Sequence, residues 1–309
     1  MKNKCDDLVS IIIPTYKRPN YLGNAIDSAL NQTYQNIEII VVDDNDPQSK
    51  ERIETEQVMF KYKENKYVKY IKHIQNSNGS VARNTGILNS KGKYICFLDD
   101  DDEFKKDKVL KQVEKMESLD NSWGACYVQF DRIKSGKLYD KGIENEEGYL
   151  MKSILLGQLY ISSGSNIMVR RDVIDEVGGF NPKLKRKQDL YFLCKIAEKY
   201  KIASIETNQL IINKYDGIKP KIDIESFKEM NDFYYIEFDN FISMLSDEDK
   251  NKLTQIKHLE YILYTILGKY KKEAIDAILS NKTDLLLLLK YLKYYITRKL
   301  KKQCYGFKY

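Results

Sequence analysis

The sequence predicts an α/β fold, a doubly wound and mainly parallel sheet flanked by helices, followed by an all-α C-terminal extension. Three observations predict it. Short β-branched runs alternate with helix-spaced apolar residues over residues 9–119, acidic clusters follow two of those runs, and the pattern is helical from residue 223 onward. The length of 309 residues fits about two domains of ordinary size.

The alternation predicts four strands and four helices in the first part of the chain, and the first two strands are expected to be buried. Short, mainly apolar runs are expected to be strands, and apolar residues spaced by three or four indicate helices. The expected strands are residues 9–13, 37–42, 68–74 and 94–98, and the expected helices are residues 20–31, 48–63, 81–88 and 105–119.

The rest of the chain changes from a mixed pattern to a helical one. We expect strands at residues 126–131, 166–169 and 202–215, and helices at residues 188–199, 223–245, 249–268, 271–279 and 284–302. A boundary near Lys219 and Pro220 would separate an α/β domain, residues 1–219, which would hold any active site, from a helical extension, residues 220–309.

Composition excludes several classes of protein. The longest uninterrupted apolar run is residues 285–289, far below the ~20 residues of a membrane span, and the polar start of the chain lacks a signal-peptide core. Five scattered cysteines without a CxxC pair, and only two histidines, argue against a disulfide scaffold or a zinc site. A cytoplasmic location fits best.

The positive charge is concentrated at the C-terminus. Residues 281–309 hold eight basic residues and one acid, although the formal net charge of the whole chain is only +6. A nucleic-acid-binding protein would spread basic residues over a folded face, so we expect no nucleic acid partner.

Two acidic clusters follow predicted strands. The aspartates at 99–102 come after residues 94–98, and Asp43 and Asp44 come after residues 37–42. Carboxyl ends of parallel strands share one edge of a sheet, so both clusters are expected at one crevice, and hard carboxylate oxygens suit Mg²⁺ or Mn²⁺. The alternatives are a solvated acidic turn at 99–102 and a helix cap or turn at Asp44.

Two glycine-containing turns complete the candidate chemistry. Asn78 and Gly79 lead into a helix that carries Arg83, a plausible clamp for phosphate. Gly178 and Gly179 precede a basic loop and Asp189, which by itself would be a helix cap. GxGxxG and GxxxxGK[ST] motifs are both missing, which disfavours an NAD site and a P-loop.

Taken in order, these motifs resemble those of the family 2 glycosyltransferases over residues 8–215. The matching stretches are residues 9–18, with Pro14-Thr15-Tyr16, residues 29–34 and 39–44, residues 78–86, with Ala82-Arg83-Asn84, residues 92–102, Gly178-Gly179-Phe180 and Gln188-Asp189. Five ordered motifs at suitable spacing make this resemblance specific, whereas the helical region after 220 is not covered.

The resemblance implies a GT-A type fold and an inverting transferase. It implies nucleotide binding by Pro14, Tyr16, Arg18, Asp44, Arg83, Asp99 and Asp100, a metal at Asp101, catalysis by Asp189 as general base, and phosphate or acceptor contacts from Arg186 and Lys187. The cofactor would be Mn²⁺ or Mg²⁺. Which of the four contiguous aspartates binds the metal stays open, and Gln188 stands where the family often has Glu.

The leading hypothesis is therefore transfer of a sugar from a nucleotide-sugar donor, a UDP-sugar in our expectation, to a surface glycan acceptor that is lipid-linked. Two alternatives remain. A catalytically silent module would bind a glycan or a nucleotide without turnover, and an acid-cluster phosphohydrolase would release phosphate but would leave Asp44 and Asp189 unexplained.

The C-terminal helix at 284–302 interleaves leucine and tyrosine with lysine, which is typical of a membrane-surface element. An enzyme acting on a lipid-linked acceptor would sit peripherally on the inner face of the cytoplasmic membrane. The alternative is that the apolar face packs on the protein and lysine faces water.

Overall fold

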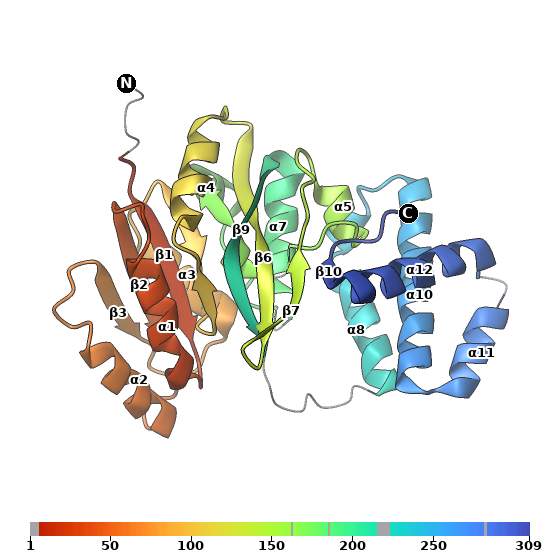
Figure 1. Ribbon diagram of the computed structural model, residues 1–309, viewed down its shortest axis with the longest axis horizontal. Helices are drawn as coiled ribbons and strands as arrows, with labels where there is room; N and C mark the ends of the chain where they lie inside the picture. The colour runs from red at the N-terminus through yellow and green to blue at the C-terminus, as the bar shows by residue number, and fades with distance from the viewer. Residues whose placement is uncertain (1–5, 162, 185, 215–222, 281–282) are drawn as a thin grey trace. The chain divides into compact units, whose positions relative to one another are not determined.

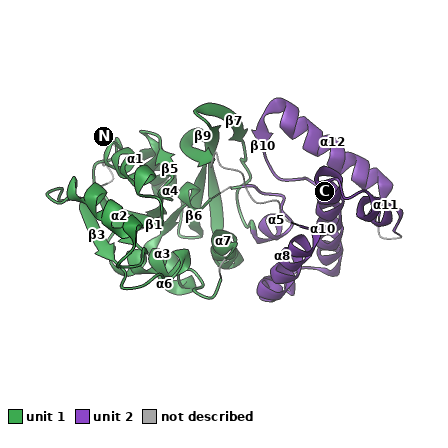
Figure 2. Cartoon of the chain, turned by 90° about the horizontal axis from the view of Figure 1, so that it is seen from below, with its two compact units in different colours: residues 1–150, 161–215 green, residues 151–160, 216–309 purple. Residues whose placement is uncertain are grey.

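The computed structural model describes residues 6–161, 163–184, 186–214, 223–280 and 283–309. The chain divides into two compact units, unit 1 with residues 1–150 and 161–215 and unit 2 with residues 151–160 and 216–309 (Figure 2). The expected boundary at Lys219 and Pro220 lies outside the described residues. Unit 2 also includes the stretch 151–160, which the sequence pattern did not set apart from its surroundings.

A mixed sheet forms the centre of unit 1 (Figure 1). Its strands follow the order β7-β6-β8-β4-β1-β2-β3, with β9 paired to β6 and β5. Their bounds are β1 (Val9–Thr15), β2 (Ile37–Asp43), β3 (Val68–Lys72), β4 (Tyr94–Phe97), β5 (Asp102–Phe104), β6 (Trp123–Lys134), β7 (Lys137–Gly142), β8 (Met168–Arg170) and β9 (Lys201–Lys214).

The first four strands are parallel, as the sequence predicts. Ile11 of β1 lies opposite Ile39 of β2 and Cys96 of β4, and all three side chains are fully buried. Burial on both faces suits the β-branched residues that dominate β1 and β2, whereas β3 is only partly buried. The other half of the sheet is mixed, because β8 runs antiparallel to β4 and β6, β7 antiparallel to β6, and β5 antiparallel to β9. The predicted fold class is confirmed.

Helices cover both faces of the sheet. They are α1 (Pro19–Leu30), α2 (Lys50–Phe60), α3 (Gly79–Leu88), α4 (Lys108–Glu117), α6 (Arg171–Val177) and α7 (Gln188–Lys199). Strand order reverses between β1 and β4, so right-handed crossovers place α1 and α2 on one face and α3 on the other. Gly86 allows α3 to approach β1, because a Cβ there would stand 2.3 Å from the Ile12 side chain.

An aromatic cluster fixes α7 and the loop before it against β4. The ring of Phe97 lies 5.0 Å from that of Phe180 and 6.0 Å from that of Phe192, and Phe180 stacks on Phe192 at 4.3 Å. All three rings are buried. The cluster therefore brings the start of α7, with Gln188 and Asp189, to the side of the sheet where β4 ends.

Unit 2 is helical apart from a two-residue strand. Its elements are α5 (Met151–Leu155), α8 (Ile224–Glu237), α9 (Asp239–Ile242), α10 (Asp247–Gly268), α11 (Lys271–Leu279), α12 (Leu285–Lys301) and β10 (Gln303–Cys304). The helix expected at 223–245 is interrupted at Phe238, whose buried ring stacks on Tyr234 at 4.7 Å. Among the described helices, none combines the length and apolar character that a bilayer crossing requires.

Candidate active site

A cavity of about 430 Å³ opens at the carboxyl ends of β1, β2 and β4, beside the reversal of strand order. Ligands bind at this position in open α/β sheets. Every residue to which the resemblance assigns nucleotide binding lines it. The lining residues are Pro14, Thr15, Tyr16, Arg18, Asp44, Asn76, Asn78, Gly79, Ala82, Arg83, Asp99, Asp100 and Gln188.

Left-handed backbone turns border the cavity at three residues that are not glycine. Lys17, Asn78 and Lys187 have φ of +59°, +85° and +55°. Such backbone conformations cost free energy in L residues and gather at functional sites. Asn78, with ψ of +163°, lies in a backbone region nearly restricted to glycine, and its side chain caps α3, since Oδ1 accepts from the N–H groups of Ser80 and Val81.

The first two of the contiguous aspartates face different basic residues. Arg83 Nη2 donates to Asp99 Oδ1 at 2.6 Å. Asp100 is buried, and it accepts from Thr15 Oγ1 at 2.7 Å and from Arg18 Nη1 at 3.1 Å. Asp99 and Asp100 thereby join the loop after β4 to the loop after β1 and to α3.

The last two aspartates point to different surroundings. Asp101 pairs with Arg18, with 2.7 Å between Oδ2 and Nη1. Asp102 begins β5 and is buried, where it accepts from Ser165 Oγ at 2.6 Å and from the backbone N–H of Asn213 at 3.3 Å. Asp102 is therefore held inside unit 1 by hydroxyl and amide donors, away from the residues that line the cavity.

Burial raises the pKa values of Asp100 and Asp101, and repulsion between neighbouring carboxylates adds to the effect. Burial raises the pKa of Asp100 to about 6, against the lowering effects of Thr15 and Arg18. Burial also raises the pKa of Asp101, and Asp99 adds to the rise. Within the described residues, no cluster of three or more His, Cys, Asp or Glu side chains could hold an ion.

These carboxylates nevertheless fit a divalent cation of the Mg²⁺ type. The side chains of Asp99 and Asp101 are about one-quarter exposed, at 24% and 25%, and both belong to the repelling group. Such ions use one or two carboxylates and take further oxygens from substrate phosphates and water. A cation would offset the repulsion from Asp99 that adds to the effect of burial on the pKa of Asp101.

Asp44 organises the loop on the nucleotide side of the cavity. Its Oδ1 accepts from His73 Nδ1 at 2.7 Å and from Ser77 N at 2.8 Å, and its Oδ2 accepts from Asn76 Nδ2 and Asn78 N, each at 2.9 Å. These bonds occupy the four lone-pair positions of the carboxylate. Asn76 Nδ2 also donates to the backbone oxygen of Asp44 at 3.0 Å. The amide nitrogen of Asn76 is therefore used by Asp44, and the amide oxygen can accept a hydrogen bond from a ligand.

Asp189 lies one residue beyond the cavity lining, in the first turn of α7. Its Oδ1 is buried without a hydrogen-bond partner among the described residues. Burial raises the pKa of the Asp189 carboxyl, the Arg83 guanidinium lowers it, and Asp99 raises it. Arg83 Nη1 also donates to Gln188 Oε1 at 3.2 Å, so one guanidinium links the start of α7 to Asp99.

Gly164 lies directly against the Asp189 carboxylate. A Cβ at this glycine would stand 2.9 Å from Asp189 Oδ1, closer than real Cβ contacts allow. The glycine therefore leaves the space that the carboxylate occupies. The basic residues Arg186 and Lys187 precede α7 but are not among the residues that line the cavity.

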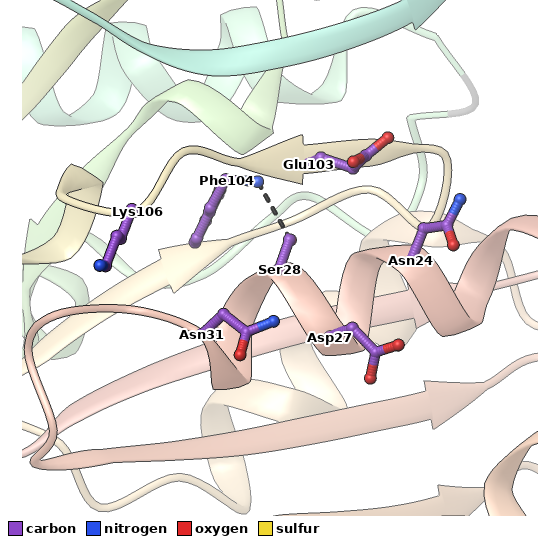
Figure 3. A pocket seen from close by; sticks show the side chains of 7 residues that line it. All are labelled: Asn24, Asp27, Ser28, Asn31, Glu103, Phe104 and Lys106. Carbon is purple, nitrogen blue, oxygen red and sulfur yellow. Dashed lines mark hydrogen bonds between the residues drawn. The ribbon is translucent and has the colours of Figure 1, made fainter.

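A second hollow, of about 550 Å³, lies between α1 and β5 (Figure 3). The Phe104 N–H donates to Ser28 Oγ there at 3.1 Å, and Asp27 accepts from Tyr62 Oη at 2.8 Å. None of the residues to which the motifs assign a role in binding or catalysis lines it. Its size alone does not make it the site, so we assign the candidate site to the smaller cavity.

Sequence reasoning missed several residues of the site. Thr15 and Asn76 line the cavity, and Gly164 touches Asp189, although the sequence analysis assigned a role to none of them. Thr15 directly follows Pro14 at the end of β1, which was a usable signal. Gly164 is remote in sequence from every motif, and nothing in its neighbourhood indicated a role.

Comparisons with known proteins show the family and the fold of the chain. The family model described as glycosyl transferase family 2 matches residues 10–178. An uncharacterised glycosyltransferase of Rickettsia felis is 31% identical over 259 residues, covering 82% of this chain and 41% of the relative. The glucosyltransferase WfgD of Escherichia coli, named for UDP-Glc and α-D-GlcNAc-diphosphoundecaprenol, is 27% identical over 276 residues, covering 88% of this chain and 97% of WfgD.

Solved structures show the same fold. Staphylococcus aureus TarS 1–349 in complex with UDP aligns with a TM-score of 0.56 at 17% identity, covering 87% of this chain and 88% of TarS. The mannosyltransferase PcManGT of Pyrobaculum calidifontis, in complex with GDP-Man and Mn²⁺, aligns with a TM-score of 0.55 at 15% identity, covering 95% and 83%.

The chain belongs to glycosyltransferase family 2, and its fold is of the GT-A type. An uncharacterised relative in Rickettsia prowazekii, 33% identical, is matched over 70% of both chains. The chain spans less than half the length of three other Rickettsia relatives, at 41%, 29% and 40%.

Proposed function

We propose that the protein is an inverting glycosyltransferase that moves a sugar from a UDP-sugar to a hydroxyl group of a lipid-linked glycan acceptor. Asp189 is the general base, and Asp101 is the residue that holds Mn²⁺ or Mg²⁺. The nucleotide diphosphate occupies the cavity at the ends of β1, β2 and β4.

One observation carries this proposal. Arg83 bonds at the same time to Asp99, on the side of the proposed metal, and to Gln188, the neighbour of Asp189. The proposed base and the proposed diphosphate site are therefore joined through a single buried guanidinium. If residues 99–102 were only a solvated turn and Asp189 only a helix cap, the two would not need to be connected in this way.

The reaction needs a base on one side of the sugar and charge stabilisation on the other. The acceptor oxygen bonds to the anomeric carbon while the bond from that carbon to the diphosphate oxygen breaks, and the acceptor proton passes to Asp189. A carboxylate in this role contributes ~10²–10⁴-fold. The raised pKa of Asp189 brings its proton affinity closer to what a neutral-pH base requires.

The leaving diphosphate takes up negative charge, which Arg18 and Arg83 are placed to balance. Both guanidinium groups already pair with carboxylates at the cavity, and both have raised pKa values, so they stay charged. A bound divalent cation would polarise the phosphate oxygens of the leaving group. Arg186 and Lys187, at the start of α7, supply further positive charge for phosphate or acceptor.

The nucleoside side of the cavity fits a uracil. Pro14 and Tyr16 present apolar and aromatic surface, and the Tyr16 ring is exposed for stacking. Asp44 fixes Asn76 so that the amide oxygen of Asn76 accepts a hydrogen bond. Uracil offers an N–H donor at N3, whereas the N3 of cytosine is an acceptor. TarS in complex with UDP supports this choice of donor.

The proposed acceptor follows the relative WfgD, whose name specifies a sugar on diphosphoundecaprenol. Mn²⁺ together with GDP-Man in PcManGT supports the proposed metal. We propose that unit 1 carries out catalysis and that the helices of unit 2 contact the acceptor or a surface.

The test is a transfer assay with wild type and Asp189→Asn. UDP-sugars are offered together with GlcNAc-diphospholipid, and UDP release and product mass are measured with Mn²⁺ present. We expect wild type to form a product of inverted anomeric configuration. The variant should lose ~10²–10⁴-fold in rate while it still binds UDP, as measured by thermal unfolding.

The matched control is Asp175→Asn, an exposed carboxylate on α6, which should leave the rate unchanged. Equal behaviour of wild type and Asp189→Asn, without turnover in either, would favour a silent binding module. Phosphate release without an acceptor would favour a phosphohydrolase.

A further inference from the structure

The last long helix of unit 2, α12, carries two apolar faces, of which one is buried. Leu287, Leu288 and Tyr291 face the interior of unit 2. The ring of Tyr291 lies 4.9 Å from that of Phe307, so the chain after α12 helps to cover this face. The buried face accounts for the fold of the helix, and it needs no external partner.

The second apolar row faces solvent. Its members follow one another at intervals of three, seven and four residues, so they line one side of the helix. They are Leu286, Leu289, Ile296 and Leu300, which are 80%, 63%, 54% and 80% exposed, and Leu285, 59% exposed, stands beside them. Exposed apolar groups arranged in a continuous row indicate an interaction surface, unlike single exposed leucines.

Lysine residues border this row along both sides. At about 100° per residue, Lys290 and Lys301 fall on one border, Lys299 falls on the other, and Lys293 stands within the row. These lysines are exposed, and α12 contains no acidic residue between its N-cap Asp284 and its end. An apolar strip between rows of lysine matches the interface of an anionic bilayer.

We propose that this face of α12 docks on an anionic phospholipid surface, with the leucine row inserted among the acyl chains and the lysines at the headgroups. Charge complementarity favours a membrane over a second copy of the chain, because two such faces would bring lysine against lysine. The inference goes beyond the proposed function, since binding to a membrane requires neither donor nor metal.

The test is co-sedimentation of the full chain with vesicles of phosphatidylcholine alone or mixed with phosphatidylglycerol, without nucleotide. We expect binding to the anionic vesicles at low salt, and weaker binding at high salt because the attraction is screened. Lys290→Gln, Lys293→Gln and Lys301→Gln together should lower the partition coefficient about 100-fold, at about five-fold for each lysine near the surface. Leu289→Gln with Leu300→Gln should lower it by about 100-fold as well.

Matched controls come from exposed positions of unit 1. Ile74→Gln with Leu88→Gln removes two apolar side chains that are 89% and 85% exposed, and Lys50→Gln with Lys63→Gln and Lys66→Gln removes three exposed lysines. Both control sets should bind vesicles as wild type does. The same melting temperature in all variants would show that the fold is intact.

Three results would overturn the proposal. Wild type could fail to sediment with anionic vesicles at low salt, or the α12 variants could bind as well as their controls. A leucine variant that leaves vesicle binding unchanged but lowers the oligomeric mass in light scattering would assign the row to a second copy. Each of these results is independent of whether UDP binds or sugar is transferred.

Discussion

Arg18 lies between two carboxylates of the aspartate run, and its Nη1 stands 2.7 Å from Asp101 Oδ2 and 3.1 Å from Asp100 Oδ1. Arg18 Nη1 therefore occupies the space beside Asp101 Oδ2 that a cation bound to Asp101 would need. If Asp101 holds a divalent cation, as we propose, Arg18 and the cation compete for the same carboxylate oxygen in the absence of a diphosphate.

We expect Arg18→Gln to tighten the binding of Mn²⁺ to the nucleotide-free protein and to weaken the binding of UDP. The side chain of Arg18 is half exposed, so the effect should be about 1 kcal/mol, or about five-fold, in each direction. Titration of free Mn²⁺ by electron spin resonance, with and without UDP, measures the first effect. Lys50→Gln, a surface cation far along the chain from the aspartates, is the control. Unchanged Mn²⁺ affinity in Arg18→Gln would refute the competition.

The position of this competition could be predicted only in part from the sequence. The end of strand β4 and the four aspartates after it were visible, because a short apolar run followed by acids is a strong local pattern. The sequence did not indicate in which direction the side chain of each of these four aspartates points. The chain turns after Asp99 and begins β5 at Asp102, so Asp102 faces Ser165 whereas Asp101 faces Arg18.

Long-range pairing limited the rest of the prediction. The polar strand β7 and the three-residue strand β5 have no apolar pattern of their own, and they form because β6 and β9 supply partners. Helix α5 belongs to unit 2 through contacts that are distant in sequence, such as the hydrogen bond from Tyr234 Oη to Leu155 O. In contrast, α7 begins and ends where its amphipathic pattern predicts.

The acid limb of the pH profile should respond in opposite directions to two substitutions near Asp189. If Asp189 is the general base, as we propose, the rate requires its ionised form, so kcat/KM falls as the pH drops through the pKa of that carboxyl. Arg83 lowers this pKa and Asp99 raises it. We therefore expect Arg83→Gln to move the acid limb to higher pH and Asp99→Asn to move it to lower pH.

This prediction concerns the position of the limb, because both substitutions also reduce the affinity for the donor. The profile of kcat/KM is the appropriate measurement, since it reports on groups of the free enzyme. Shifts of the same sign in both variants would show that another group controls the limb.

Asn76 should contribute to the choice of nucleotide. Its two amide hydrogens are taken by Asp44, so only its oxygen can meet a base. We expect Asn76→Ala to weaken UDP binding about five-fold, which corresponds to about 1 kcal/mol for one hydrogen bond, and to leave CDP binding nearly unchanged. Isothermal titration with both nucleotides tests this, and Asn24→Ala in the other hollow is the control. An equal loss for UDP and CDP would show that Asn76 does not read the base.

Gly164 offers a way to displace Asp189 without changing its chemistry. In Gly164→Ala the new Cβ would stand 2.9 Å from Asp189 Oδ1 and 3.3 Å from its Cγ, so the carboxylate must move. Misplacement of a catalytic group by about 1 Å can cost about 10²-fold in rate, so we expect kcat to fall by that order while UDP still binds. The control is Gly23→Ala in α1, where a Cβ meets atoms only at 3.8 Å and beyond. The substitution could also change the pKa of Asp189, which depends on the same neighbouring residues. A lower kcat with an unchanged acid limb of the pH profile would show that displacement of the carboxylate, and not a changed pKa, causes the loss. Full activity in Gly164→Ala would mean that Asp189 is not the base, because a carboxylate that transfers the acceptor proton does not tolerate such a shift.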